Sequence, residues 1–323
     1  MISGPLGLFL NAFSVTLMSA LIIILLFSLL LTTDIWNHVN LSARDRHRVL
    51  WFLVLAPWVI GAIATLIVFT LSASSLSVLS DSDLVHWHHL SEFHVGSWHG
   101  FLVFIMVVRG GLMLLRVVNK VIAVNQSAEM LSQFAKSRAD GMRELDSESY
   151  AAFTSGIKHP ACYITRALVS ELDPLEYEII RQHEMSHADS KDPARKAWFQ
   201  IMAGFYPAVI SRFLLSQMVT AIEQIADSRV AETCKDKAAI ARTLLKVQRL
   251  SMRPLGSDSL FTGTCHFGAE SIEQRINYLL SEDPKQSLSY SLVIIITVLL
   301  AIGCALGADS LHHAIELTLQ HSH

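Results

Sequence analysis

Hydrophobic residues along the chain gather into four long stretches, with polar segments between them. These stretches run over Leu6–Leu31, Val49–Leu71, Val95–Leu115 and Tyr290–Ala308. Each is long enough to cross roughly 30 Å of hydrocarbon as a helix. The first stretch is too long for a signal peptide and no basic residue precedes it, so we interpret it as a retained span. The pattern predicts an α-helical polytopic membrane protein with four transmembrane helices.

The basic residues lie almost entirely on one side of these spans. Residues 1–43 and 49–100 contain no Lys or Arg, and all basic residues except Arg109 fall within 44–48 and 116–285. Because Lys and Arg concentrate in the cytoplasmic loops of membrane proteins, both termini are predicted to lie outside. We therefore expect a multi-pass protein of a bacterial-type inner (cytoplasmic) membrane, with its largest polar region in the cytosol.

This topology divides the chain into four parts. Residues 1–118 contain the first three spans, with a His-rich extracellular loop at 72–94. Residues 119–289 form a cytosolic domain inserted between the third and fourth spans, and residues 290–308 form the fourth span. A short extracellular tail follows at 309–323.

The composition excludes several classes of protein. Hydrophobic residues make up 52% of the 323 residues and charged residues 16%, which excludes intrinsic disorder. The net charge is −3, from 25 basic and 28 acidic residues, so we expect no direct binding to nucleic acid. Four cysteines are too few for a disulfide scaffold, and three of them fall in the predicted cytosolic domain.

A helix carrying a metal-binding motif is predicted within the cytosolic domain. The segment Asp173–Glu176 reads D-P-L-E, with an Asp N-cap, Pro at the first helical position and Glu three residues after the cap. The helix then carries H-E-x-x-H, with His183 and His187 one turn apart on the same face. Both imidazoles can therefore bind one Zn²⁺, and Glu184 beside them can take a proton from a water at the metal.

A second helical stretch supplies a carboxylate for the same ion. The stretch spans Ala208–Cys234 and contains Glu223 and Asp227, again one turn apart. We expect Glu223 to be the third metal ligand and Asp227 to accept a hydrogen bond from a ligand histidine. Two histidines and one glutamate leave a fourth position open for water, as in catalytic zinc sites. The alternative for the two carboxylates is an ordinary solvated helix face.

The chain resembles a known family at these positions. The motifs that carry the resemblance are G-I-K-H-P-A-C-Y-I at 156–164, H-E-x-x-H followed by Asp192, F-Y-P at 205–207, and E-x-x-A-D at 223–227. Together with four spans and a domain between the third and the fourth, they are similar to the membrane-embedded zinc peptidases of the BlaR/MecR antirepressor type.

The resemblance implies a fold and an activity. The inserted cytosolic domain would be an α+β gluzincin zinc-protease domain, with one catalytic Zn²⁺ held by His183, His187 and Glu223 and with Glu184 as the general base. The protein would be a signal-transducing endopeptidase whose proteolysis leads to loss of a winged-helix transcriptional repressor. A more distant likeness to HtpX and to CAAX-processing proteases leaves membrane-protein quality control as the alternative.

The C-terminal part departs from this family. Beta-lactam receptors of this type carry a large extracellular penicillin-binding-like domain after the fourth span, whereas residues 309–323 alone follow it here. We therefore expect that this chain does not itself bind a beta-lactam. For the oligomeric state, a homodimer in the lipid bilayer is one of the alternatives. A metal-binding receptor or transporter without hydrolytic activity is a rival of another class, and the predicted spans offer few polar residues for it.

Two short apolar runs precede the metal-binding helix. Ser149–Thr154 and Ala161–Thr165 are rich in β-forming residues and are separated by a turn. In gluzincins a strand beside the active-site helix binds the substrate backbone, and the second run is our candidate, with an ordinary buried strand as the alternative. Its residues are Ala161, Cys162, Tyr163, Ile164 and Thr165.

The patterns of two later segments predict a loop and a helix. The segment Arg253–Glu270 is rich in Gly and Ser and is predicted to be a loop. Ser271–Leu280 is predicted to be helical. On that helix, Arg275 either stabilises the transition state from the cleft or lies on the surface.

Two features of the predicted membrane region have no role in the metal site. Arg109 lies within the third span without an acidic residue in any span to pair with, so it either marks a functional site or reaches the aqueous interface. Five histidines in and beside the extracellular loop either bind a transition metal, respond to pH or are simply solvated. They are His86, His88, His89, His94 and His99.

Overall fold

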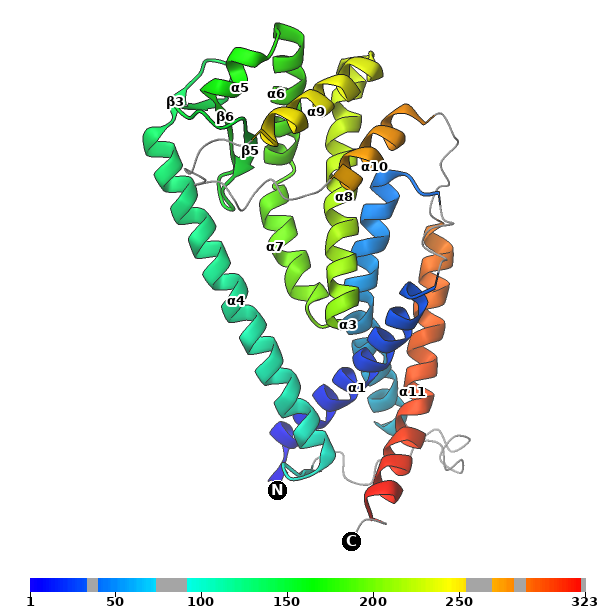
Figure 1. Cartoon of the computed structure of the whole chain (residues 1–323). Helices are drawn as coiled ribbons and strands as arrows, with labels where there is room; N and C mark the ends of the chain where they lie inside the picture. Colours follow the sequence, from blue (N-terminus) through cyan, green and yellow to red (C-terminus); the bar gives the residue numbers. More distant parts are fainter. Residues whose placement is uncertain (34–39, 74–91, 254–268, 282–288, 321–323) are drawn as a thin grey trace.

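The computed structural model of the protein describes residues 1–33, 40–73, 92–253, 269–281 and 289–320. Long helices form a bundle at one end of the molecule, and a small sheet with shorter helices forms the other end (Figure 1). The long helices are α1 (Pro5–Leu31), α3 (Ala43–Ala73), α4 (Trp98–Phe134) and α11 (Tyr290–Gln320). The N-terminus and the end of α11 lie at the end of the bundle away from the sheet.

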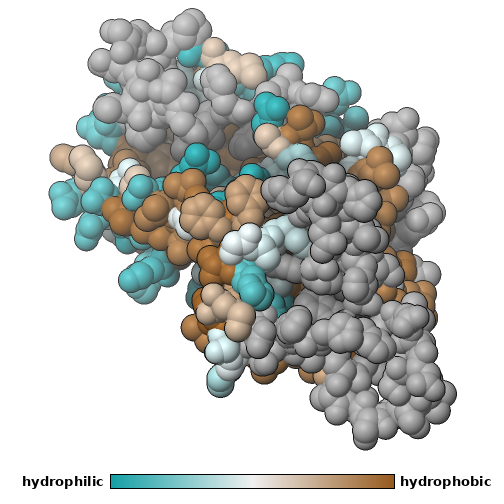
Figure 2. Space-filling model, turned by 90° about the horizontal axis from the view of Figure 1, so that it is seen from below, coloured by the Kyte–Doolittle hydropathy of each residue, from teal (hydrophilic) through white to brown (hydrophobic). Residues whose placement is uncertain are grey.

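Three of these helices are long and apolar enough to cross a membrane. The qualifying segments are Pro5–Leu31, Ala43–Thr70 and Gly100–Phe134, whereas α11 contributes a shorter apolar segment, Val293–Gly307. α4 runs well past the predicted end of the third span at Leu115, because no Gly or Pro follows to stop it. Seen from below, hydrophobic side chains gather on the surface of the bundle (Figure 2), as expected for helices that meet lipid.

A four-stranded sheet follows α4. The strands stand in the order β3, β4, β6, β5, with β4 and β6 parallel and the other two pairs antiparallel. Their bounds are Lys136–Ser137 for β3, Arg143–Leu145 for β4, Ala152–Ser155 for β5 and Ala161–Thr165 for β6. The second predicted strand is confirmed as β6. The first begins at Ala152 instead of Ser149, because Ser149 forms a turn in which its N–H donates to Ser147 Oγ at 3.2 Å.

Six further helices follow the sheet in the described part of the chain. They are α5 (Arg166–Glu171), α6 (Pro174–Asp189), α7 (Asp192–Ala203), α8 (Ala208–Thr233), α9 (Lys237–Ser251) and α10 (Ala269–Leu280). Among them, α5 and α6 pack against the sheet. The predicted capping box at the start of α6 is confirmed. The Glu176 N–H donates to the Asp173 carboxylate at 2.8 Å, and the Asp173 N–H donates to the Glu176 carboxylate at 2.9 Å.

α7 and α8 form a helical hairpin whose tip reaches into the bundle of long helices. Its apolar side chains, including Phe199 and Leu214, join those of α1, α3 and α11 in one buried cluster. At the tip, the buried Tyr206 donates its hydroxyl to the Leu53 carbonyl of α3 at 2.5 Å. The two helices that lead to the metal site are therefore packed directly against the apolar helices.

Arg109 of α4 finds its partners at the tip of the same hairpin. One guanidinium nitrogen donates to the carbonyl of Gly204 at 2.8 Å and to that of Tyr206 at 3.4 Å. Because Gly204 follows the last turn of α7, its carbonyl lies at the negative end of the helix dipole. The charge inside α4 is thus paired with backbone carbonyls.

The start of α3 also contacts α8 and α10, two helices of the polar part of the molecule. The Ala43 N–H donates to the Tyr278 hydroxyl of α10 at 2.8 Å, and Arg46 donates to the Gln224 side chain of α8 at 3.3 Å. These contacts tie one end of an apolar helix to two helices of the polar domain.

A short antiparallel pairing between β1 (Ile2–Ser3) and β2 (Glu92–Phe93) joins the N-terminal residues to the segment before α4. Sequence patterns did not predict it, because two-residue strands carry no periodicity. Most of the predicted extracellular loop and of the predicted loop at Arg253–Glu270 lie outside the described residues.

Candidate metal centre

The two histidines of the H-E-x-x-H motif lie on the inner face of α6. Helical periodicity places His183 and His187 on the same side as Ile179 and Ile180, and all four side chains are buried. α6 packs against α8, so the motif faces the helix that carries Glu223. The fold therefore turns both imidazoles toward the predicted third ligand.

Three ligand atoms converge on one point in this space. The Nε2 atom of His183 lies 3.2 Å from that of His187 and 3.3 Å from Glu223 Oε2, and the His187 Nε2 to Glu223 Oε2 distance is 3.6 Å. Two ligand atoms of a tetrahedral zinc ion with bonds near 2.0–2.1 Å stand roughly 3.3 Å apart. The three residues thus have the spacing of a tetrahedral metal site, and they form a candidate metal-binding group among the described residues.

The other ring nitrogen of each histidine faces a carboxylate. His187 Nδ1 lies 2.8 Å from Asp192 Oδ2, and His183 Nδ1 lies 3.0 Å from Asp227 Oδ1, although the second contact is poorly aligned for a hydrogen bond. A carboxylate at Nδ1 favours the tautomer with the proton there, which leaves a lone pair on each Nε2. Lone pairs that face one another at such short distances repel unless a proton or a metal ion lies between them, so the donor set fits a metal ion.

The electrostatics of the site also favour a cation. Burial opposes ionisation of Glu223, but the neighbouring His187 charge and the bond to His183 hold the pKa of Glu223 well below its usual range. Burial likewise opposes the charged form of His187, but the Glu223 charge and the Asp192 contact raise the pKa of His187 to about 10. The centre therefore holds a carboxylate that stays ionised and attracts positive charge.

Arg275 of α10 lies beside this centre, and little of its side chain is exposed. Its guanidinium donates two hydrogen bonds of 2.8 Å to the Asp227 carboxylate and comes within 3.4 Å of Glu223 Oε2. Its side chain is only 12% exposed, so the alternative of a surface role is wrong. The guanidinium holds Asp227 and Glu223 in place, because both of its edges are engaged with their carboxylates.

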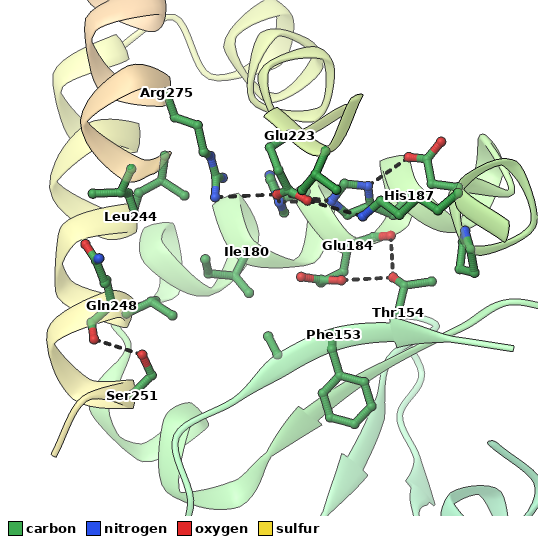
Figure 3. A pocket seen from close by; sticks show the side chains of 18 residues that line it. Phe153, Thr154, Ile180, Glu184, His187, Glu223, Leu244, Gln248, Ser251 and Arg275 are labelled. Carbon is green, nitrogen blue, oxygen red and sulfur yellow. Dashed lines mark hydrogen bonds and ion pairs between the residues drawn. The ribbon is translucent and has the colours of Figure 1, made fainter. Parts of the chain in front are cut away.

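Glu184 points into a cavity of about 360 Å³ next to the ligand cluster (Figure 3). The Thr154 hydroxyl of β5 lies 2.9 Å from the Glu184 carboxylate and 2.9 Å from its carbonyl, so this hydroxyl positions the glutamate. Another wall of the cavity comes from α6, α9 and α10. Its apolar residues are Ile180, Leu244, Val247 and Ile272, and the polar Gln248 and Ser251 of α9 lie beside them (Figure 3).

The predicted substrate-binding strand is wrong for a physical reason. β6, with Ala161, Cys162, Tyr163, Ile164 and Thr165, pairs with β4 on one edge and with β5 on the other. A strand that is paired on both edges offers no backbone groups to a further strand. β3 and β5 are the two edge strands of this sheet among the described residues, and Ala152, Phe153 and Thr154 of β5 line the cavity.

The histidines proposed to sense a metal or pH are not brought together in the described residues. His86, His88 and His89 lie outside the described part of the chain, as does the side chain of His99. His94 is described, and its side chain is exposed.

Sequence analysis gave no role to two residues that contact the site, Thr154 and Asp192, although Asp192 is part of the motif that carries the resemblance. Thr154 lies on the edge strand β5, 30 residues before Glu184, and no local pattern links them. Asp192 follows His187 by five residues across a turn. Its place as the first residue of a new helix could be recognised from Asp192-Pro193, but its contact with the imidazole could not.

Comparisons with models of protein families, with curated proteins and with solved structures find no match for this chain.

Proposed function

We propose that this protein is a membrane-embedded zinc endopeptidase of the BlaR/MecR type. The observation that carries the proposal is the triangle of His183 Nε2, His187 Nε2 and Glu223 Oε2, with sides of 3.2 to 3.6 Å, beside a buried glutamate in a cavity. Two histidines and one glutamate are the ligand set of catalytic zinc in peptidases, and a structural zinc more often has four protein ligands.

The proposed reaction is hydrolysis of a peptide bond. Zinc bound by the three ligands would act as a Lewis acid that polarises the scissile carbonyl and makes water a better nucleophile. Glu184 takes a proton from the attacking water and delivers it to the nitrogen of the leaving amine. Thr154 holds the Glu184 carboxylate toward the cavity, and Asp192 and Asp227 fix the imidazole rings.

The edge strand β5 offers a place for the substrate backbone. A substrate segment in extended form would add to β5 beside α6 and so pass the mouth of the cavity. The apolar side chains of Leu244 and Ile272 would receive a hydrophobic side chain of that segment. The substrate class is therefore an extended polypeptide segment with a large apolar residue next to the cleaved bond.

The proposed topology has four spans, with α11 as the fourth. The Val293–Gly307 segment of α11 packs with α1 and α3, and the basic residues lie on the side of the metal centre. By the distribution of Lys and Arg, the metal centre lies in the cytosol and both termini lie outside a bacterial-type inner membrane.

The proposed physiological role is that of an antirepressor protease. Its protein substrate, or a product of its activity, would lead to loss of a winged-helix transcriptional repressor. The alternative is a quality-control protease similar to HtpX, which would cleave many membrane proteins with the same chemistry.

Replacing the general base tests the proposed chemistry. Glu184→Gln keeps the shape of the side chain but cannot accept the proton, so we expect peptide cleavage to fall by at least about 100-fold. Zinc content, measured by elemental analysis of the purified protein, is expected to stay near one per chain. Cleavage at the wild-type rate by this variant would contradict the mechanism.

The same variant separates the two physiological roles. Bound substrates are trapped on Glu184→Gln in cells and identified by mass spectrometry. Capture of one repressor favours the antirepressor role, and capture of many unrelated membrane proteins favours quality control.

A further inference from the structure

A groove runs between α3 and α7, and none of the three candidate metal ligands lines it. We call it the α3–α7 groove, and it encloses about 560 Å³. The residues that define it here are Trp51, Leu55, Lys191, Arg195, Trp198 and Met202. Large apolar side chains remain open to the surroundings there, since Trp198 is 62% exposed and Leu55 is 42% exposed.

Residues of the groove are ordered by depth in the membrane. α3 begins with charged residues up to Arg48 and is apolar from Val49 onward, so Trp51 lies about one turn inside the apolar segment. α7 runs beside α3 in the same direction. The Trp51 ring packs against Phe199 of α7, with ring centroids 5.4 Å apart. Further along α3, the Trp58 ring packs against Phe205, which lies two residues after the end of α7, with ring centroids 4.7 Å apart.

The polar end of the groove is therefore at the level of the lipid headgroups. Arg195 lies about one turn before Phe199 on α7, toward the charged end of α3, and Lys191 lies one turn further. Trp198 and Met202 lie on the apolar side of that level. Tryptophan is enriched at this boundary because its ring is apolar and its N–H is polar.

The charges at the polar end suit an anionic ligand. Lys191 and Arg195 are both exposed, and no hydrogen bond is made by the Lys191 ammonium among the described residues. Arg195 has a single loose ion pair with Asp192, at 3.8 Å. The Asp189 carboxylate also lines the groove, and Asp192 is shared between Arg195 and His187. Lys191 is therefore the cation of this groove that has no carboxylate within 4.0 Å among the described residues.

Lys191 also has an unusual backbone conformation. Its φ of +53° lies in the left-handed region, where Lys191 is the sole residue other than glycine with a positive φ in the described part of the chain. Glycine would be less strained at this position, so the presence of a lysine favours a role for its charged side chain.

We propose that the α3–α7 groove binds one anionic phospholipid. Its phosphate lies between the Lys191 ammonium and the Arg195 guanidinium, and one acyl chain lies along Trp198, Leu55 and Met202. This binding goes beyond the proposed protease activity and does not depend on it, because no ligand of the metal centre lines the groove.

Native mass spectrometry of the full chain in detergent tests this proposal. Phosphatidylglycerol and phosphatidylcholine with the same acyl chains are titrated in turn. Each basic residue near an anionic headgroup contributes about 1 kcal/mol, which is about fivefold in affinity. We expect one phosphatidylglycerol to bind more tightly than phosphatidylcholine, and Lys191→Gly together with Arg195→Gln to weaken it about 30-fold.

The single variant Lys191→Gly distinguishes a loss of lipid binding from a folding defect. Glycine suits the left-handed backbone, so we expect unchanged thermal stability together with about fivefold weaker binding of phosphatidylglycerol. The matched control is Lys235→Gln with Lys237→Gln, which removes two exposed cations near the start of α9 and is expected to leave lipid binding unchanged.

Two results would overturn the proposal. One is equal binding of the two lipids by the wild-type chain. The other is an unchanged preference for phosphatidylglycerol in Lys191→Gly with Arg195→Gln. Inorganic phosphate and glycerol phosphate serve as headgroup probes, and displacement of the lipid by either one at the lipid's own concentration would also count against a lipid site.

Discussion

At the scale of single residues, the candidate metal centre is supported by side chains outside the group of three possible ligands. Asp192 and Asp227 face the outer nitrogens of the two histidines, and Arg275 engages Asp227 with two hydrogen bonds. Each of these groups removes rotational freedom from a side chain of the centre before a metal binds. Contacts of this kind typically change metal affinity or activity by 10-fold to 100-fold when they are lost.

Thr154 allows a test of this support at the general base. Thr154→Val keeps the shape of the side chain but removes the hydroxyl that contacts the Glu184 carboxylate. A hydrogen bond to a charged group contributes about 1.5–3 kcal/mol, so we expect kcat to fall by at least about tenfold. Peptide cleavage and zinc content are measured together, and zinc content is expected to stay unchanged. Thr154→Ser, which retains the hydroxyl, is the control, and a loss of equal size in both variants would argue against the hydrogen bond.

At the scale of elements, the α7–α8 hairpin connects the metal centre to the apolar helices. α7 begins with Asp192 and α8 carries Glu223, and their shared tip is held by Tyr206 against α3 and by Arg109 from α4. Two of the groups that build the centre are therefore attached to rigid helices whose far ends are packed among the apolar helices.

Arg109 provides the test of this connection. Arg109→Leu removes the donor to the Gly204 carbonyl, which then faces an apolar environment without a partner. We expect a loss of about 2 kcal/mol in stability, which lowers the Tm in lipid nanodiscs by several degrees. Arg116→Leu, further along α4 and without a hydrogen bond to the hairpin in the described residues, is the matched control. Equal melting temperatures for Arg109→Leu and the wild type would contradict a stabilising role of Arg109.

At the scale of the whole molecule, the candidate metal centre is built from separate parts of the chain. His183 and His187 come from α6, Glu223 comes from α8, and Arg275 comes from α10. A metal ion that binds these groups in the folded protein and not in the unfolded chain stabilises the fold by mass action.

Removal of the metal tests this role of the centre. We expect a strong chelator to lower the Tm, because zinc at 100 times its Kd contributes about 2.7 kcal/mol to stability. Thermal unfolding is measured with added zinc and with chelator. His187→Ala is expected to abolish the difference between the two conditions, whereas His159→Ala, an exposed histidine in the turn between β5 and β6, is expected to retain it. A Tm that does not respond to zinc in the wild type would contradict a metal centre at this position.

The sequence by itself determined the features that depend on short-range order. The apolar helices follow from the length of uninterrupted hydrophobic stretches, and the start of α6 follows from the capping box at Asp173. His183 and His187 lie on the same face because four residues are close to one helical turn. These features involve residues that are neighbours in the chain, so a local pattern contains all the information needed.

The tertiary structure alone decided the features that join distant residues. β6 became an inner strand and β5 an edge strand because strand order depends on pairing with β4, which the pattern of either strand does not contain. Arg109 met the carbonyl of Gly204 and Thr154 met Glu184 through the packing of separate elements. The outcome of such packing depends on the shapes and charges of many side chains at once, and for that reason no single motif encodes it.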